Sequence, residues 1–431
     1  MHRASPNIPR PGPYLFAGRA LAAALRGCRV GTVASVRADE VVQGYLEIAA
    51  DLDRLLPGLL DVHGARPAGQ RASAPDLVRS AGRLARAVPD VMEPARGDFL
   101  RGQLVACEWT ARRLAGQAVP FGLEVQAAFG IRIEPGSPDV YRAAHRELDE
   151  LLPGSGPLAD RIGAHRVREE IPPARLEVAV RALSDALRAR TAAVISLPAA
   201  EHVDHRVVDD APWTALHHYR GGSASTVTFN AGARLRCSQL AQLVAHEVYP
   251  GHHTERCRKE AGLVAEGWDE HRAVVANTPQ SLVAEGAADV GLHAVVGPGW
   301  GPWAADVLAD VGLVFDGELA ERMDAATSVL ARARQDAALL LHGQRASDAE
   351  VLAYLRRWLL VGDARAAAVL RFLRHRVWRT YTTTYVEGPV LVRNWWEAGE
   401  QGDRLRRILD EPLTPWALRA ESAQVPAAPS G

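Results

Sequence analysis

The strongest constraint in the sequence is the pair Pro250-Gly251, which follows a helix-forming segment at residues 240–247. The apolar spacing of that segment favours a helix whose last turn carries His246 and Glu247. Pro250 has no N–H to donate to the carbonyl group of His246, and its ring clashes with that turn of a helix. Gly251 tolerates the dihedral angles of a sharp bend. We therefore expect the helix to break at this pair.

Two histidines, His252 and His253, follow the break. In zinc peptidases the usual HExxH arrangement places two histidines four residues apart on one helix face, with the glutamate as general base. Here the second histidine comes six or seven residues after His246, which on a straight helix is a rise of about 9–10.5 Å. Both nitrogens must lie about 2.0–2.1 Å from one metal ion, so a straight helix fails. A bend can fold one histidine back; we favour His252 as the ligand and His253 as its neighbour, with the reverse assignment as the alternative.

A second helix-forming segment, residues 281–289, supplies the carboxylates that such a site needs. Glu285 is the expected third protein ligand, since two histidines and one carboxylate leave a fourth position for water. Asp289 is one helical turn further on and is expected to accept the N–H of a ligand histidine, which would fix its tautomer. Glu247 is the expected general base. The sequence therefore predicts a zinc site with an activated water beside a catalytic carboxylate.

Four polar residues near residue 380 are candidates for contacts with the reacting group. Tyr381, Tyr385 and His375 are expected to stabilise a developing oxyanion. Arg379 is expected to bind substrate or to meet the same charge. For the two tyrosines, packing with a hydrogen-bonded hydroxyl group is an equally strong interpretation.

Residues 213–230 differ from the helical remainder because they alternate and contain β-branched side chains, which predicts one or two strands around a glycine turn. The strand at 225–230 could pair with an extended substrate as an added strand. Tyr219, Thr228 and Asn230 are therefore predicted to bind substrate. The acidic segment that precedes these strands, residues 201–210, is expected to be a solvated loop.

Helical periodicity dominates the rest of the chain, so the predicted fold is mainly α with a small β element. The predicted organisation is a flexible N-terminal lead-in at 1–37, a helical region at 38–200, a zinc-binding catalytic region at 201–418 and a flexible tail at 419–431, with 38–418 as one continuous domain.

Composition excludes several classes of function for this chain of 431 residues. A formal net charge of -1 gives no electrostatic reason to expect nucleic acid or an anionic membrane as the partner. The four cysteines have no CxxC spacing, which argues against disulfides and against a cysteine zinc site. No apolar run of membrane-spanning length and no clear signal peptide is present, so we expect a soluble, cytoplasmic protein.

The segment from His246 to Thr254, HEVYPGHHT, resembles the HExxPGHH signature of the family called domain of unknown function 885, which is grouped with the glutamate-zincin metallopeptidases. Residues 278–288 resemble its TP…EGxA segment, and residues 219–230 resemble its preceding strand. The resemblance implies a mainly helical, zincin-like fold, zinc binding and peptide-bond hydrolysis. Ala287 stands where the family often has an aromatic residue, a departure that touches no proposed ligand.

These residues favour a zinc-dependent hydrolase that acts on a peptide or a small amide. Three alternatives use the same residues. The zinc-bound water could serve a non-peptide amidase or deacylase in a biosynthetic pathway, a catalytically silent helical binding protein could retain the metal site, or the His-His-carboxylate set could hold non-haem iron.

Overall fold

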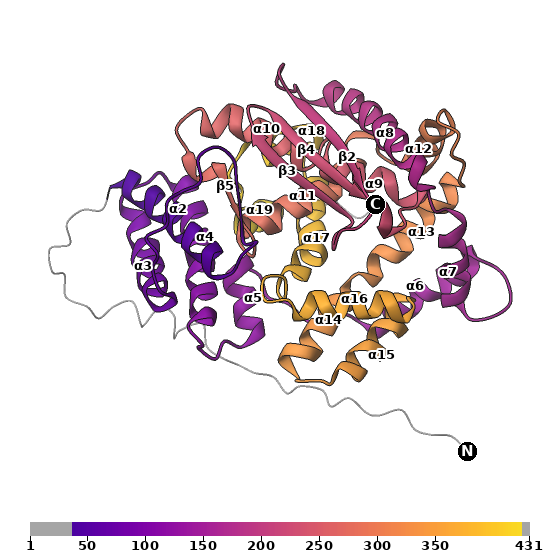
Figure 1. Cartoon of the computed structure of the whole chain (residues 1–431), viewed down its shortest axis with the longest axis horizontal. Helices are drawn as coiled ribbons and strands as arrows, with labels where there is room; N and C mark the ends of the chain where they lie inside the picture. Colours follow the sequence, from indigo (N-terminus) through magenta and orange to yellow (C-terminus); the bar gives the residue numbers. More distant parts are fainter. Residues whose placement is uncertain (1–36, 425–431) are drawn as a thin grey trace. The chain divides into compact units, whose positions relative to one another are not determined.

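The computed structural model in Figure 1 describes residues 37–424 of the chain. It is 66% helix and 7% strand, which confirms the predicted mainly α fold with a small β element. Within the described residues, the chain from Ala38 to Gln424 forms one compact unit. The predicted lead-in at 1–37 and tail at 419–431 fall outside the described residues, apart from residue 37 and the end of the last helix, which continues to Gln424.

The helices follow one another through most of this unit. In chain order they are α2 (Ala38–Leu55), α3 (Ala74–Ala87), α4 (Pro94–Leu114), α5 (Phe121–Phe129), α6 (Pro138–Leu151), α7 (Leu158–Arg168), α8 (Pro173–Val194), α9 (Cys237–Glu247), α10 (His252–Lys259), α11 (Pro279–Val295), α12 (Trp300–Ala309), α13 (Gly317–Leu330), α14 (Arg332–Ala338), α15 (Asp348–Leu359), α16 (Asp363–Arg374), α17 (Thr384–Glu397), α18 (Gln401–Asp410) and α19 (Pro415–Gln424). A short 3-10 helix, η6 (Tyr381–Thr383), leads into α17.

The strands of the described region form two small sheets. In the larger sheet the order is β2-β4-β3, with β2 (His202–Val208) parallel to β4 (Ala224–Asn230) and β3 (Ala215–Gly221) antiparallel to it. The smaller sheet pairs β1 (Leu60–Val62) with β5 (Ala273–Val275). The predicted hairpin is therefore present as β3 and β4. The interpretation of the preceding acidic segment as a solvated loop is wrong, because that segment is β2.

Strand β4 lies in the centre of its sheet, and this corrects one prediction. Its Val227 stands opposite His205 of β2 on one side and His217 of β3 on the other. The backbone of β4 is thus paired along both edges and cannot accept a substrate strand. Strand β3 lies at one edge of this sheet and packs against α9 and α10.

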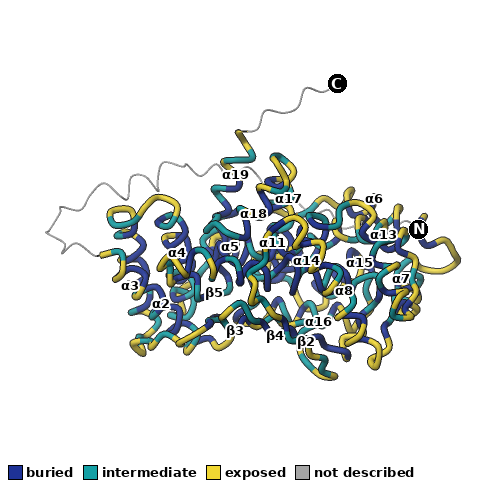
Figure 2. The backbone as a smooth tube through the Cα atoms, turned by 90° about the horizontal axis from the view of Figure 1, so that it is seen from above, coloured by how far each residue is buried: buried dark blue, intermediate teal, exposed yellow. Residues whose placement is uncertain are grey.

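Helix α11 is largely buried and joins two hydrophobic cores (Figure 2). Leu282 belongs to the core formed with α5, α6 and α13 to α16, whereas the next residue, Val283, belongs to the core formed with α8, α9, α12 and the larger sheet. Trp395 of α17 is fully buried in the second core, and Trp396 is nearly so. Cys237 and Cys257 are also buried and free, in agreement with the sequence interpretation.

Helices α11 and α17 approach each other at two glycines. A Cβ atom on Gly388 would lie 2.7 Å from the carbonyl oxygen of Leu282, and a Cβ atom on Gly286 would overlap the carbonyl oxygen of Gly388. Real Cβ atoms essentially never come so close to a backbone oxygen, so only glycine permits this separation of the helices. The contact sets the distance between Glu285 on α11 and the two tyrosines in η6 and the first turn of α17.

The substitution Gly286→Ala should destabilise the protein by about 1–3 kcal/mol or more, since the backbone of α17 must move to admit the methyl group. Gly163→Ala is the matched control, because Gly163 lies within α7 and a Cβ atom there would meet nothing within 4 Å. That control should be neutral or stabilising by up to about 1 kcal/mol, as alanine is the better helix former. Chemical denaturation of both variants measures the difference, and equal stability would contradict the packing argument.

Candidate metal centre

The predicted break in the helix lies between α9, which ends at Glu247, and α10, which begins at His252. The amide nitrogen of Gly251 donates to the carbonyl oxygen of Ala245 at 2.9 Å. A Cβ atom on Gly251 would overlap the carbonyl oxygen of His246, so a side chain at this position is excluded. The break brings the imidazole of His252 back against that of His246, with ring centroids 4.7 Å apart and planes at 87°.

The structure brings His246, His252 and Glu285 together, with one ligand atom from each residue within 4.8 Å of the others. Glu285 Oε2 lies 3.2 Å from His246 Nε2, and Glu285 Oε1 lies 3.8 Å from His252 Nε2. Glu285 Oε2 is nevertheless buried without a hydrogen-bond partner among the described residues. An ion bound between the two nitrogens and this oxygen would satisfy it. The donor set is that of catalytic zinc sites, which keep a fourth position open.

The three candidate ligands shift one another's pKa values. Burial raises the pKa of the Glu285 carboxyl, but the nearby His246 and His252 more than offset this and hold the pKa below its usual value. Burial lowers the pKa of His246, but the Glu285 carboxylate outweighs it and raises that pKa to about 9. Histidine binds metal in its neutral form, so a proton and a metal ion compete for this pair.

Glu247 stands beside the three candidate ligands. Burial raises the pKa of its carboxyl, an effect that the charges of His246 and His252 oppose. Its charge also acts on Tyr381 and Tyr385. A carboxylate with a raised pKa near a group of candidate metal ligands is a candidate general base.

The two predicted tyrosines line the same centre. The hydroxyl group of Tyr381 donates to Glu285 Oε1 at 2.7 Å. The ring of Tyr385 packs edge-on against that of Tyr381, with centroids 5.5 Å apart. Tyr385 is 41% exposed, so its side chain is partly open to solvent.

His253 points away from the three candidate ligands and is fully buried. Its Nδ1 lies 2.8 Å from Ser225 Oγ of β4, and its Nε2 lies 3.1 Å from Glu201 Oε2. Glu201 also accepts hydrogen bonds from Tyr249 and Arg188. His253 therefore ties α10 to the sheet. The structure therefore gives His253 a structural role, in place of the predicted role as a neighbour of the metal ligands.

His217 is a residue that the sequence interpretation left unassigned. Its Nε2 lies 2.9 Å from Ser225 Oγ, and its ring centroid lies 6.0 Å from that of His252. Strand β3 thus presents an imidazole towards the candidate centre. Alternation along a strand was visible in the sequence, but the position of β3 over α10 depends on long-range packing.

The predicted role of Asp289 is not observed. In the part of the chain that the structure describes, no hydrogen bond joins its carboxylate to His246 or His252. Its backbone carbonyl accepts a hydrogen bond from Gln242 Nε2 at 2.7 Å. Asp289 acts on His246 only through its charge.

Two predicted contacts with the reacting group are wrong because their side chains are engaged elsewhere. His375 is exposed and contacts its own loop, where Nδ1 accepts from the amide nitrogen of Val377 at 3.2 Å. Arg379 forms an ion pair with Glu124 of α5, with Nη2 2.8 Å from Oε2. Neither side chain contacts the candidate ligands.

The three predicted substrate-binding residues in the larger sheet have structural roles instead. Tyr219 is 1% exposed, and its hydroxyl group donates to Glu260. Asn230 holds the loop before β3, with Nδ2 donating to the carbonyl oxygen of Trp213 at 2.9 Å. Thr228 lies in the central strand, whose backbone is already paired on both sides.

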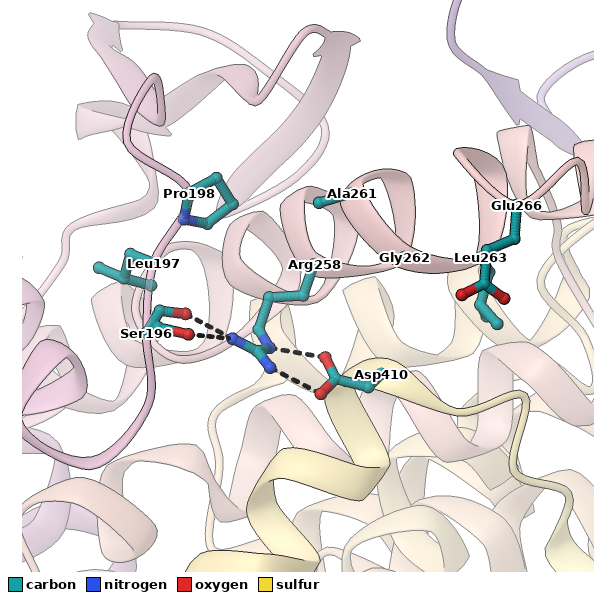
Figure 3. A pocket seen from close by; sticks show the side chains of 9 residues that line it. All are labelled: Ser196, Leu197, Pro198, Arg258, Ala261, Gly262, Leu263, Glu266 and Asp410. Atoms are coloured by element: carbon teal, nitrogen blue, oxygen red, sulfur yellow. Dashed lines mark hydrogen bonds and ion pairs between the residues drawn. The ribbon is translucent and has the colours of Figure 1, made fainter.

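A cavity of about 450 Å³ lies beside the end of α10 and is lined by none of the candidate ligands. Figure 3 shows that its one arginine, Arg258, reaches Asp410 through two hydrogen bonds of 2.6 Å and also contacts Ser196. All three side chains are thus engaged with one another. The charges of Arg258 and Asp410 therefore offset each other in this cavity.

Comparison with known proteins shows no matching family model and no matching curated protein. Two solved structures are similar. The first, described as "the putative lipoprotein from Colwellia psychrerythraea", is 14% identical over 82% of this chain and 67% of its own, with a TM-score of 0.45. The second, "a putative lipoprotein of unknown function from Shewanella oneidensis", is 10% identical over 94% of this chain and 91% of its own, with a TM-score of 0.47. Sequence identities this low indicate similarity of fold and nothing more.

The predicted cytoplasmic location is contradicted by these two neighbours. Both are described as putative lipoproteins, and the cytoplasmic assignment is not kept. Within residues 37–424, no helix combines the length and the apolar character needed to cross a bilayer.

Measurements of metal content should distinguish the roles of the two adjacent histidines, His252 and His253. His252→Ala should lose most of the roughly one zinc ion per chain expected for the wild type, since a ligand is removed. His253→Ala should keep the metal but lose about 1–3 kcal/mol of stability, because Glu201 and Ser225 lose a buried partner. Elemental analysis and thermal unfolding of both variants test this, and metal loss in His253→Ala with retention in His252→Ala would reverse the assignment.

Proposed function

We propose that the protein is a zinc-dependent hydrolase that cleaves a peptide or amide bond. The observation that carries the proposal is the convergence of His246, His252 and Glu285 on one point, with Glu247 beside them. Two imidazoles and one carboxylate leave one coordination position open, which distinguishes a catalytic zinc site from a structural one. The orphaned Oε2 of Glu285 fits the same ion.

A zinc ion held by these three residues would supply a Lewis acid and an activated water molecule. Glu247 then accepts a proton from the attacking water and passes it to the leaving amine. The raised pKa of its carboxyl suits this double role, because the group must both take and release the proton near neutral pH.

Tyr381 and Tyr385 are placed to donate hydrogen bonds to the carbonyl oxygen of the substrate as it gains negative charge. The hydroxyl group of Tyr381 already lies within hydrogen-bond distance of a candidate ligand. The ring of Tyr385 packs against that of Tyr381. Both phenols remain protonated at neutral pH, so each can act as a donor.

Strand β3 favours an extended peptide as the substrate. It is an edge strand in the described part of the chain, and it packs against both helices that carry the histidines. A peptide added along this edge would pair through its main chain, as in recognition by strand addition. Leu216, which is 47% exposed, and His218 alternate on the strand with His217, which faces the centre.

The variant Glu247→Gln should keep its zinc but lose turnover by about 10²–10⁴-fold, since the amide cannot accept the proton. Glu266→Gln is the matched control, because Glu266 is exposed and distant from the candidate ligands. Hydrolysis of a mixed peptide library, read by mass spectrometry, gives the rates. Normal cleavage by zinc-loaded Glu247→Gln would rule out this residue as the base.

The variants Tyr381→Phe and Tyr385→Phe should identify the donor to the developing charge. Loss of the hydroxyl group that stabilises the oxyanion should lower kcat by about 10²–10³-fold while KM changes little. The other tyrosine should have a smaller effect. If both variants turn over at the wild-type rate, neither phenol takes part in the reaction.

A further inference from the structure

A continuous series of hydrogen bonds leads from a buried carboxylate to His217 of β3. Glu201 Oε2 lies 3.1 Å from His253 Nε2, and His253 Nδ1 lies 2.8 Å from Ser225 Oγ. Ser225 Oγ lies in turn 2.9 Å from His217 Nε2. The side chains of Glu201 and His253 are each 1% exposed, and Ser225 is fully buried, so water does not compete for these bonds. These four residues are called the Glu201 network below.

The charge of Glu201 sets the direction of the hydrogen bonds in this network. Burial raises the pKa of the Glu201 carboxyl, but hydrogen bonds from His253, Tyr249 and Arg188 outweigh this effect and lower the pKa to about 2. A carboxylate can only accept hydrogen bonds, so Nε2 of His253 carries the proton. Burial lowers the pKa of His253, which keeps its ring neutral and leaves Nδ1 without a proton.

The single hydroxyl hydrogen of Ser225 extends this order to His217. Ser225 donates that hydrogen to Nδ1 of His253, so its oxygen accepts the second bond from Nε2–H of His217. Cys257 Sγ lies almost equally far from both nitrogens of His253, at 3.6 Å and 3.7 Å, and is therefore outside the direction of either lone pair. Burial and the neighbouring His252 lower the pKa of His217 far below its usual range. The ring of His217 is thus neutral, and its Nδ1 carries a lone pair.

Nδ1 of His217 remains open to a ligand beside the candidate metal centre. Within residues 37–424 no hydrogen bond reaches this atom, and it is not among the buried polar atoms that lack a partner, so solvent contacts it. The ring centroid of His217 lies 6.0 Å from that of His252. His217 is not a member of the group of three residues whose ligand atoms lie within 4.8 Å of one another. It therefore offers a hydrogen-bond acceptor next to the centre and not a further metal ligand.

Strand β3 also turns the main chain of His217 towards an unpaired edge. The carbonyl oxygen of Thr214 accepts a hydrogen bond from the amide nitrogen of Asn230 at 2.9 Å. Bonded residues alternate along an antiparallel pair, so the main chains of Leu216 and His218 bond to β4 while that of His217 points the other way. In the described part of the chain, β3 has a partner strand on one side only. A peptide added along this edge would pair with the main chain of His217 and pass close to its imidazole.

We propose that His217 Nδ1 accepts a hydrogen bond from a main-chain N–H of the peptide substrate, close to the bond to be cleaved, and that the Glu201 network holds the ring in this form. This inference rests on the proposed function, which it deepens by requiring a secondary amide at one position of the substrate. An ester oxygen or an N-alkylated amide brings no hydrogen to Nδ1, so such substrates leave the acceptor unpaired and are rejected. A charged terminal amine is also disfavoured, because a metal ion in the centre would repel it.

The first test is nitrogen-15 NMR of the full chain labelled at histidine, which reports the ring nitrogen that carries the proton. His217→Asn removes one histidine and so assigns its signals. The wild type should carry the proton of His217 on Nε2, with and without added zinc. Ser225→Ala should lose this preference, because the acceptor for Nε2–H is gone. Ser184→Ala is the matched control, since Ser184 lies 3.0 Å from His205 Nε2 in a similar pair on β2 and should leave the His217 signals unchanged. A proton on Nδ1 in the wild type, or unchanged His217 signals in Ser225→Ala, would overturn the proposal.

The second test measures binding of acetyl-pentaalanine amide and of its single-ester analogues, in each of which an oxygen atom replaces one alanine N–H. The protein is the full-length Glu247→Gln variant, which is expected to bind peptides without cleaving them. The parent peptide should shift the Nδ1 signal of His217. One ester analogue should leave that signal in place and bind about fivefold or more weakly, as expected for the loss of one hydrogen bond. Adding His217→Phe should make the parent and that analogue bind alike. Equal binding of all the peptides to Glu247→Gln, or an Nδ1 signal that no peptide shifts, would contradict the proposal.

The outcome of these tests is separable from that of the proposed function. Neither the proton position nor peptide binding needs turnover, so a chain without hydrolysis that passes both tests would reject the hydrolase but keep His217 as a peptide-binding residue. With an active enzyme, His217→Asn should retain more of the wild-type kcat/KM than His217→Phe, because the amide oxygen of asparagine takes the place of the acceptor at Nδ1. His205→Asn, the control on β2, should match the wild type. Equal loss in both His217 variants would show that the acceptor is not what the substrate needs.

Discussion

The close approach of α11 and α17 is the contact on which the candidate centre depends. Gly286 and Gly388 allow the two backbones to meet without side chains between them. One helix carries Glu285, and the other begins beside Tyr381, so the 2.7 Å hydrogen bond between these residues is set by backbone packing. The distance between these two side chains is therefore determined mainly by the positions of the helix backbones and much less by the flexibility of the side chains. A metal ligand and a candidate catalytic hydroxyl group are positioned by the same two glycines.

A second constraint divides the roles of two adjacent histidines. A continuous helix would carry His252 away from His246, but the break before α10 returns it to the same place. His253 then faces the opposite way, into the buried pair of Ser225 and Glu201. One residue is free to bind metal because its neighbour holds the helix to the sheet.

The sequence supported the fold class and the two candidate histidine ligands because both depend on local rules. Helical periodicity and the Pro-Gly break lie within a few residues of the histidines. The errors concern partners that are distant in the chain. Arg379 is paired with Glu124, and Tyr219 with Glu260, and no local pattern encodes either choice. The central position of β4 likewise depends on its pairing with β2, whose polar sequence resembles a loop.

Helix α11 places neighbouring residues, Leu282 and Val283, in two different hydrophobic cores. Neither core can loosen without disturbing the helix that the other also needs. The described unit should therefore unfold as one cooperative body, with little scope for local opening around the candidate centre. Since a ligand that binds only the folded state shifts its unfolding equilibrium, a metal ion on α11 would strengthen both cores together. Occupancy of one small site would in this way set the heat resistance of the whole unit.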